Sequence, residues 1–205
     1  MQATTNARED SMTDQLSLIG FPSAPKPTDR LFFGLRPDTS VPPRLTQIAE
    51  RLRTGHGLKG KPLPPERFHV TLVHLGDYHG VPTGLVKTAT AAAATVVAPP
   101  FEAVFDRAGS FSGKPRNHPL VLRGGRGLDQ LAALQQALAG ALQQAGLGRH
   151  ASGPFTPHVT LLYDAQILPE VAIEPVGWTV KEFVLVHSLL GQTRYILLGR
   201  WPMRG

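Results

Sequence analysis

The chain has 205 residues, of which 41% are apolar, so it is long enough to form one compact domain or two small lobes around a buried core. It contains no cysteine, which excludes disulfides and thiolate chemistry. The net charge is +6, and because residues 1–29 carry −2, the remainder carries +8. Such a basic body favours an anionic partner such as RNA or a phosphate ester, although an ordinary basic surface would have the same composition.

Residues 1–29 are polar and contain prolines, with no sustained periodicity, and we predict a flexible N-terminal tail. Acidic residues stand where a secretory leader would need a basic start, and no uninterrupted apolar run has the length of a membrane span. We therefore expect a cytoplasmic protein without membrane contact, in which residues 30–205 form a single domain.

From residue 30 onward, strand-like and helix-like stretches alternate. The clearest helix covers residues 128–145, where leucines recur every three or four positions on one face. Apolar stretches rich in β-branched and aromatic residues predict strands. In chain order we predict strand 30–37, helix 41–55, strand 67–76, helix 82–98, strands 101–111 and 119–124, helix 128–145, and strands 158–163, 178–189 and 193–201. This order indicates an α+β protein.

The tetrapeptide HVTL occurs twice, at residues 69–72 and 158–161, with an offset of 89 residues. The same offset places Leu31 of the first predicted strand on Leu120 of a later one. The repetition therefore includes a strand, a helix and a second strand in each half, which is typical of a duplicated fold. An approximate twofold axis between the halves would bring both HVTL segments to one central groove.

Each HVTL segment presents a histidine and a threonine on the same face of a strand, because side chains alternate between the two faces. His69 and Thr71 would form one such pair, and His158 and Thr160 the other. Two imidazoles supply a general base and a general acid near neutral pH, and the hydroxyls can hold phosphoryl oxygens. The set suits in-line attack on a phosphodiester without a metal or cofactor.

On these residues the chain resembles the 2H phosphoesterase superfamily, and within it the bacterial RNA 2',3'-cyclic phosphodiesterases, also called the LigT-like or 2'-5' RNA ligase family. The likeness covers about residues 30–203 and includes the opening "RLFFGLRP" and the closing "FVLVHSLLGQTRYILLGRWP". It implies a duplicated bilobal fold in which two antiparallel sheets face a central cleft, with the helices outside. It also implies hydrolysis of a 2',3'-cyclic phosphate at an RNA end to a 2'-phosphate, without a cofactor.

The resemblance also implies roles for the paired residues. His69 would be the base that activates water, His158 the acid that expels the 3' oxygen, and Thr71 and Thr160 would bind phosphate. The residues alone do not order the two histidine roles, because the motifs are identical. The same chemistry run in reverse would give a 2'-5' ligation that needs no ATP.

One position departs from the family. Many members carry an arginine two residues after the leucine of the second motif, where this chain has Tyr163. A phenol donates a hydrogen bond but brings no charge. Either the substrate differs, or another cation contacts the phosphate; the candidates are Arg36, Lys114, Arg116 and Arg194. Phe33 is a candidate for stacking on a base.

Three other sequence features give weaker predictions of function. Residues 55–62, "GHGLKGKP", have glycines spaced as in a phosphate-binding loop, but Pro62 replaces the required Ser or Thr, so we predict an ordinary loop. His74, five residues after His69, should lie on the opposite face of the strand. The basic stretch 109–119 is equally compatible with an RNA-binding lip and a plain hairpin.

Two other functions remain open at this stage. The same fold could act on 2',5'-linked oligonucleotides or on small nucleotide cyclic phosphates. The chain could also be a non-catalytic RNA-binding module whose histidines only contact phosphate. For each of these functions we expect a monomer that binds RNA or an oligonucleotide. For the RNA 2',3'-cyclic phosphodiesterase, that partner ends in a 2',3'-cyclic phosphate.

Overall fold

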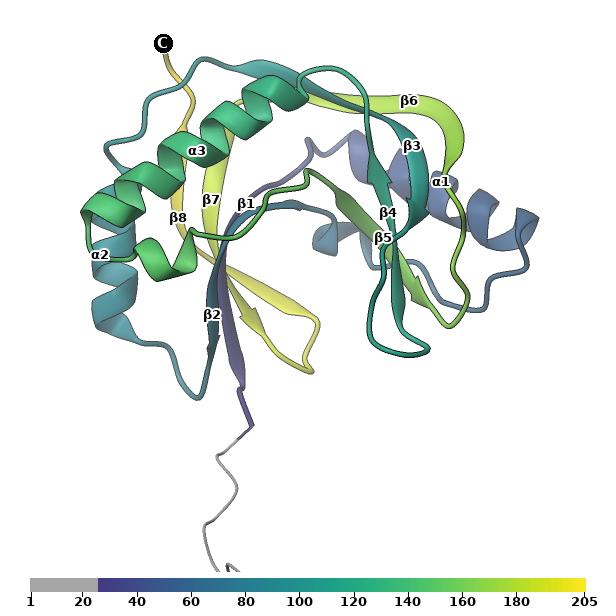
Figure 1. Ribbon diagram of the computed structural model, residues 1–205, viewed down its shortest axis with the longest axis horizontal. Helices are drawn as coiled ribbons and strands as arrows, with labels where there is room; N and C mark the ends of the chain where they lie inside the picture. The colour runs from purple at the N-terminus through teal and green to yellow at the C-terminus, as the bar shows by residue number, and fades with distance from the viewer. Residues whose placement is uncertain (1–25) are drawn as a thin grey trace, which may run out of the picture.

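The computed structural model describes residues 26–205 as two four-stranded antiparallel sheets, which confirms the predicted α+β class (Figure 1). The first sheet has the order β2 (Val70–Tyr78), β1 (Asp29–Leu35), β7 (Glu182–Leu189), β8 (Arg194–Pro202). The second sheet has the order β5 (Val159–Asp164), β4 (His118–Arg123), β3 (Phe101–Ser110), β6 (Val171–Val180). The predicted tail lies outside the described residues except for 26–29, and Asp29 already belongs to β1.

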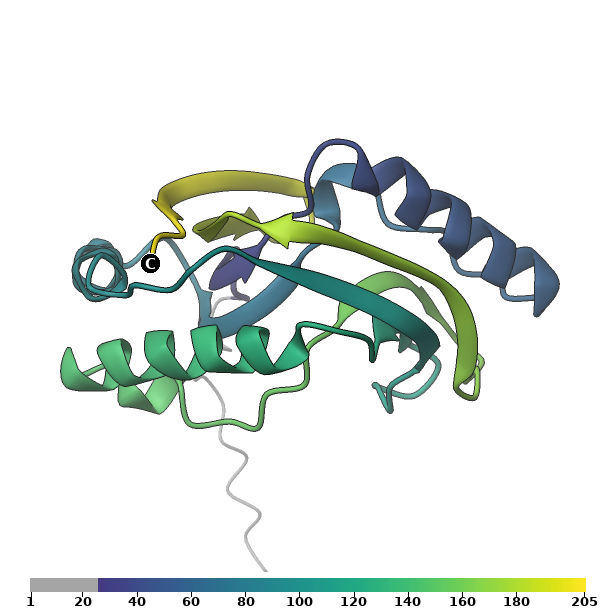
Figure 2. The same cartoon turned by 90° about the horizontal axis from the view of Figure 1, so that it is seen from above.

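The helices are α1 (Val41–Gly55), α2 (Thr83–Ala93) and α3 (Leu128–Gln144), and two short 3-10 helices are η1 (Pro65–Arg67) and η2 (Gly148–His150). The two longest helices, α1 and α3, each pack on a sheet whose histidine-bearing strand belongs to the other half of the chain. α1, from the first half, packs against β5 and β6 of the second sheet. α3, from the second half, packs against β2 of the first sheet and also contacts β3 of the second. Figure 2 shows α1 and α3 on opposite sides of the molecule. Each sheet is therefore covered by the helix of the other half.

A single large hydrophobic cluster extends through both sheets and the three helices, with a small satellite around Phe32 on the other face of the first sheet. The predicted leucine stripe of α3 is buried in the large cluster, because its spacing places one face of the helix against the sheet. The two lobes therefore share one hydrophobic core. None of the helices in the described part of the chain is long and apolar enough to cross a bilayer.

The internal repeat holds, but its offset is not constant. Gly34 of β1 pairs with Thr71, and Val121 of β4 pairs with Thr160. The paired positions are thus 37 residues apart in the first half and 39 in the second. The predicted match of Leu31 with Leu120 is therefore wrong by two residues, an even number that preserves which side chains face the core.

Three predicted elements differ in extent. The strand predicted from residue 67 begins at Val70, because Pro65–Arg67 form a 3-10 turn. The helix predicted to residue 98 ends at Ala93, just before the β-branched run 95–97 and two prolines. The strand predicted over 178–189 is interrupted at Lys181, where the chain passes from β6 in the second sheet to β7 in the first.

Candidate active site

The cleft between the two sheets contains both HVTL motifs. It has a volume of about 420 Å³ and is lined by residues of β1, β2, β5, β7, β8 and η1 and of the segments next to them. The lining residues are Arg30, Phe32, Leu63, Arg67, His69, Thr71, His74, His158, Thr160, Tyr163, Ser188, Leu190 and Tyr195. The duplication thus brings two histidines and two threonines into one cavity, although the motifs are 89 residues apart.

Both histidines are held in the same way. Nδ1 of His69 lies 2.6 Å from the carbonyl oxygen of Arg67, and Nδ1 of His158 lies 2.7 Å from that of Thr156. A carbonyl oxygen only accepts hydrogen bonds, so each Nδ1 must carry the proton. Nε2 of each ring is then the nitrogen that is left to exchange a proton with a bound molecule.

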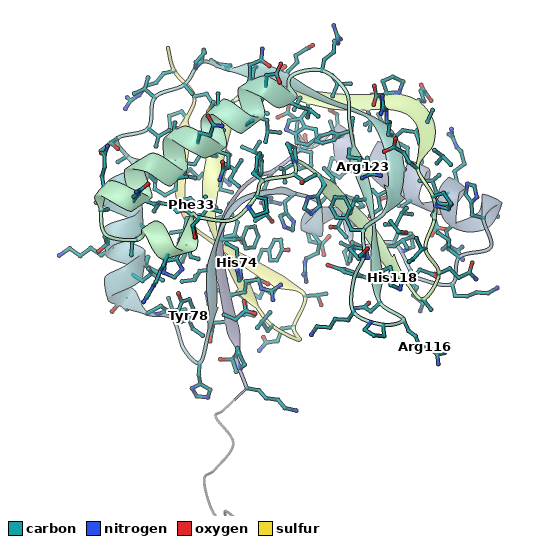
Figure 3. All side chains as sticks on the ribbon, viewed as in Figure 1. Phe33, His74, Tyr78, Arg116, His118 and Arg123 are labelled. Atoms are coloured by element: carbon teal, nitrogen blue, oxygen red, sulfur yellow. The ribbon has the colours of Figure 1, made fainter. Side chains whose placement is uncertain are left out.

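A bulge in each histidine-bearing strand changes which of its residues face the cleft. In β2, the register shifts between Phe33 and Gly34 of the partner strand, so Leu72 and Val73 are both buried. The alternation is thereby reversed, and His74 lines the cleft (Figure 3). The prediction that His74 lies on the opposite face from His69 is wrong for this reason.

The second motif has the same bulge. The register shifts between Leu120 and Val121, Leu161 and Leu162 are both buried, and Tyr163 turns into the cleft. Tyr163 is therefore the positional equivalent of His74, and it is 46% exposed, which leaves its hydroxyl accessible from the cavity.

His69 has an apolar and cationic environment. Its ring centroid lies 4.7 Å from that of Phe32 and 5.7 Å from that of Tyr195. Burial lowers the pKa of His69 from 6.5 to about 4, and the charge of Arg67 contributes in the same direction. The His69 imidazole is therefore neutral at pH 7 and available to accept a proton.

We expect the His69 imidazole, followed by NMR, to titrate near pH 4, because burial disfavours its charged form. Comparison with the His69→Gln variant would identify its signals. A midpoint at or above pH 6 would contradict the buried, cation-flanked environment.

Phe33, which is predicted to stack on a base, lies on the core face of β1 and not on the cleft face. Its side chain is fully buried between Phe183 and Trp201, with ring centroids 6.3 and 5.6 Å away. Phe32, one residue earlier, lines the cleft instead. The apolar doublet at 32–33 does not indicate which phenylalanine faces the core, because both faces of β1 are covered.

The four predicted cations do not line the cleft. Arg36 borders a different cavity, together with Lys181 and Arg200. Lys114 and Arg116 belong to the loop that joins β3 and β4, with Arg116 at its tip (Figure 3). Arg194 is the exposed first residue of β8.

The arginines that do line the cleft are Arg30 and Arg67, which sequence reasoning missed, as it missed Tyr195. Arg30 donates two hydrogen bonds of 2.7 Å to the carboxylate of Asp77. The guanidinium of Arg67 lies 4.4 Å above the ring centroid of Tyr195. Arg67 could have been suspected from its position two residues before His69, but nothing in the sequence pairs it with Tyr195.

In residues 26–205, no three histidine, aspartate or glutamate side chains gather as potential metal ligands. The cleft offers three imidazoles, two phenols, two guanidinium groups and the hydroxyls of two threonines and a serine. This set can accept a proton, donate a proton and hold an anion. The predicted independence from metal remains to be tested in solution.

Known proteins share this architecture. Residues 40–192, about three quarters of the chain, match the 2'-5' RNA ligase superfamily. The chain is 32% identical over 186 residues to the RNA 2',3'-cyclic phosphodiesterase of Escherichia coli, covering 85% of this chain and 96% of that protein. A crystal structure of a Thermus thermophilus protein superposes with a TM-score of 0.67 at 26% identity, covering 86% of this chain and 98% of that one. Apo LigT of Escherichia coli gives 0.62 at 28% identity, covering 88% and 100%.

Proposed function

The chain belongs to the 2'-5' RNA ligase superfamily, and we propose that it hydrolyses RNA 2',3'-cyclic phosphate ends to 2'-phosphates with His69 and His158 as base and acid. One observation carries the proposal. Both imidazoles donate Nδ1–H to a backbone carbonyl, which leaves two Nε2 atoms for one cleft of a size that suits a phosphate ester.

The asymmetry of the two sites supports the order of the roles. Nε2 of His69, neutral at pH 7, takes a proton from water as the water oxygen attacks phosphorus. The bond between phosphorus and O3' breaks, and Nε2–H of protonated His158 gives its proton to O3'. The products are a 2'-phosphate and a 3'-hydroxyl, while the hydroxyls of Thr71 and Thr160 donate hydrogen bonds to the phosphoryl oxygens.

The relatives support this substrate class. The Escherichia coli relative is named as an RNA 2',3'-cyclic phosphodiesterase, and LigT of the same organism has crystal structures with 3'-AMP and with phosphate. A ribonucleotide phosphate and free phosphate are thus known ligands of that relative. They agree with a cavity lined by imidazoles and threonine hydroxyls from both motifs.

We further propose that the protein acts as a monomer in the cytoplasm. One chain supplies both histidines and both threonines of the cleft, so no second copy is needed to complete it. The crossed packing of α1 and α3 supports one domain with two lobes over residues 30–205. The cytoplasmic location follows from the proposed RNA substrate, and the absence of cysteine agrees with it.

The proposal is tested by incubating the protein, in excess EDTA, with a short RNA that ends in a 2',3'-cyclic phosphate, and identifying the terminal group of the product. We expect a 2'-phosphate. A 3'-phosphate would contradict the leaving group, and loss of activity with EDTA would contradict the metal-free mechanism. Absence of any product would reject the function.

Tyr163 keeps a second substrate class open, because it places a neutral phenol in the cleft where an arginine would bring charge. The same assay should therefore include a 2',5'-linked dinucleotide and the nucleoside 2',3'-cyclic monophosphates. Faster turnover of either than of the RNA end would assign the chain to that substrate. Ligation is tested by adding a second RNA with a free 5'-hydroxyl.

A further inference from the structure

The proposed reaction needs a fixed positive charge that neither motif supplies. A phosphodiester is anionic, and its charge is concentrated on the phosphoryl oxygens during attack. His69 is neutral at pH 7, and the threonine hydroxyls and the Tyr163 phenol carry no charge. Protonated His158 gives up its charge when it gives its proton to O3', so its charge is not fixed. The two arginines that line the cleft, Arg30 and Arg67, are therefore the candidates for this charge.

Arg30 is already compensated. Its Nε and one terminal nitrogen each donate a 2.7 Å hydrogen bond to a different oxygen of Asp77, in a bidentate pair. His74 adds a third contact to the same carboxylate, at 3.1 Å. A phosphate that bound Arg30 would have to displace this ion pair, so Arg30 contributes little net charge to the cleft.

Arg67 is not compensated. No carboxylate oxygen of residues 26–205 lies within 4.0 Å of its guanidinium. Its Nε is buried and has no hydrogen-bond acceptor in the part of the chain that the structure describes. An unpaired buried donor on a charged group is costly, and such groups are commonly completed by a ligand.

The position of Arg67 is also defined. Its guanidinium lies over the ring of Tyr195, 4.4 Å from the ring centroid, and this contact restricts the motion of a long side chain. Its backbone carbonyl accepts the hydrogen bond from Nδ1 of His69, at 2.6 Å. The cation and the histidine are thus held by the same turn, η1.

We infer that Arg67, supported on Tyr195, is the residue that binds the phosphate anion of the substrate in this cleft and compensates for the neutral Tyr163. The inference rests on the proposed function for the identity of the anion. The equivalent position in the second half is Thr156, whose carbonyl holds His158 but whose side chain has no charge. The charge is therefore supplied from the side of His69.

The test measures affinity for a nucleoside 2'-monophosphate, which is the product and needs no turnover. In calorimetric titrations, we expect Arg67→Met to weaken binding by about 10–100-fold, the range for a lost charge-assisted hydrogen bond. Arg67→Lys should be intermediate, because it keeps the charge but loses the planar stack. Arg194→Met, the same change at an exposed arginine beside Tyr195, should bind as the wild type does.

Two further readouts separate phosphate binding from a structural effect. The pKa of His69 should rise in Arg67→Met, because a nearby positive charge is removed. Tyr195→Phe, which keeps the ring, should retain the affinity that Tyr195→Leu loses. Unchanged affinity in Arg67→Met, or a larger loss in Arg30→Met, would overturn the inference. An inactive wild-type protein that still binds the monophosphate through Arg67 would reject the proposed function alone.

Discussion

Replacing either cleft histidine with asparagine is expected to lower the turnover of an RNA 2',3'-cyclic phosphate by about 10²–10⁴-fold, the usual contribution of a general acid or base. Asparagine is the suitable replacement because its amide can still donate a hydrogen bond to the carbonyl of Arg67 or Thr156, while nothing in it titrates near neutral pH. The measurement is kcat for His69→Asn, His158→Asn and the double variant at saturating substrate.

The double variant should lose far less than the product of the two single losses, because the histidines act in one step. His79→Asn, an exposed histidine outside the cleft, is the matched control and should keep wild-type kcat. Single variants that retain more than about a tenth of the activity would contradict the acid and base roles. Full RNA affinity without turnover in the wild type would instead favour the non-catalytic binding module.

Asp164→Ala is expected to cost about 3 kcal/mol of unfolding free energy, the largest stability effect of a single polar side chain near the cleft. Asp164 is the last residue of β5, and its buried carboxylate accepts hydrogen bonds from the backbone N–H of Lys59 and Gly60, at 2.6 Å each, and of Gln166, at 2.8 Å. Alanine would leave these three donors without their acceptor. Urea unfolding monitored by tryptophan fluorescence measures the loss.

Asp164→Asn keeps one acceptor oxygen and should recover part of the loss, whereas Glu174→Ala, which removes an exposed carboxylate, should stay within about 0.5 kcal/mol of wild type. A loss below about 1 kcal/mol in Asp164→Ala would show that the loop does not depend on this carboxylate.

Low pH should weaken the hydrogen bonds that the Asp164 carboxylate accepts. Burial by itself would raise the pKa of Asp164, but hydrogen bonds from the backbone N–H groups of Gln166, Gly60 and Lys59 outweigh it, so the folded-state pKa is lowered. The stabilisation is therefore complete above the unfolded-state pKa of about 4 and is lost as the pH falls through the lower folded-state value. As the pH falls below about 4, the unfolding free energy of the wild type should decrease more steeply than that of Asp164→Asn.

Much of the cleft follows from alternation along a strand. The facing of His69 with Thr71, and of His158 with Thr160, requires only that side chains point to opposite sides in turn. The same alternation breaks just after each threonine, because a bulge depends on the register of the neighbouring strand and leaves no sign in the sequence. For this reason the predicted strand face of His74 is wrong.

The predicted cations are wrong for a different reason. The sequence shows which residues are basic, but a charge becomes available to a ligand only when it lies in the cleft and no carboxylate neutralises it. Asp77 neutralises Arg30, and no carboxylate of residues 26–205 neutralises Arg67. These pairings join residues up to 47 positions apart, so they can be read only from the folded chain.

The crossed packing of α1 and α3 makes the two halves of the chain depend on each other. Each half contributes the strand that carries its own histidine, but the helix that covers that strand's sheet comes from the other half. A single strand, helix and strand unit would leave an apolar sheet face exposed, and two such units would satisfy each other only by exchanging helices. Neither half is therefore expected to fold by itself, and the cleft is expected to form only once both halves are in place.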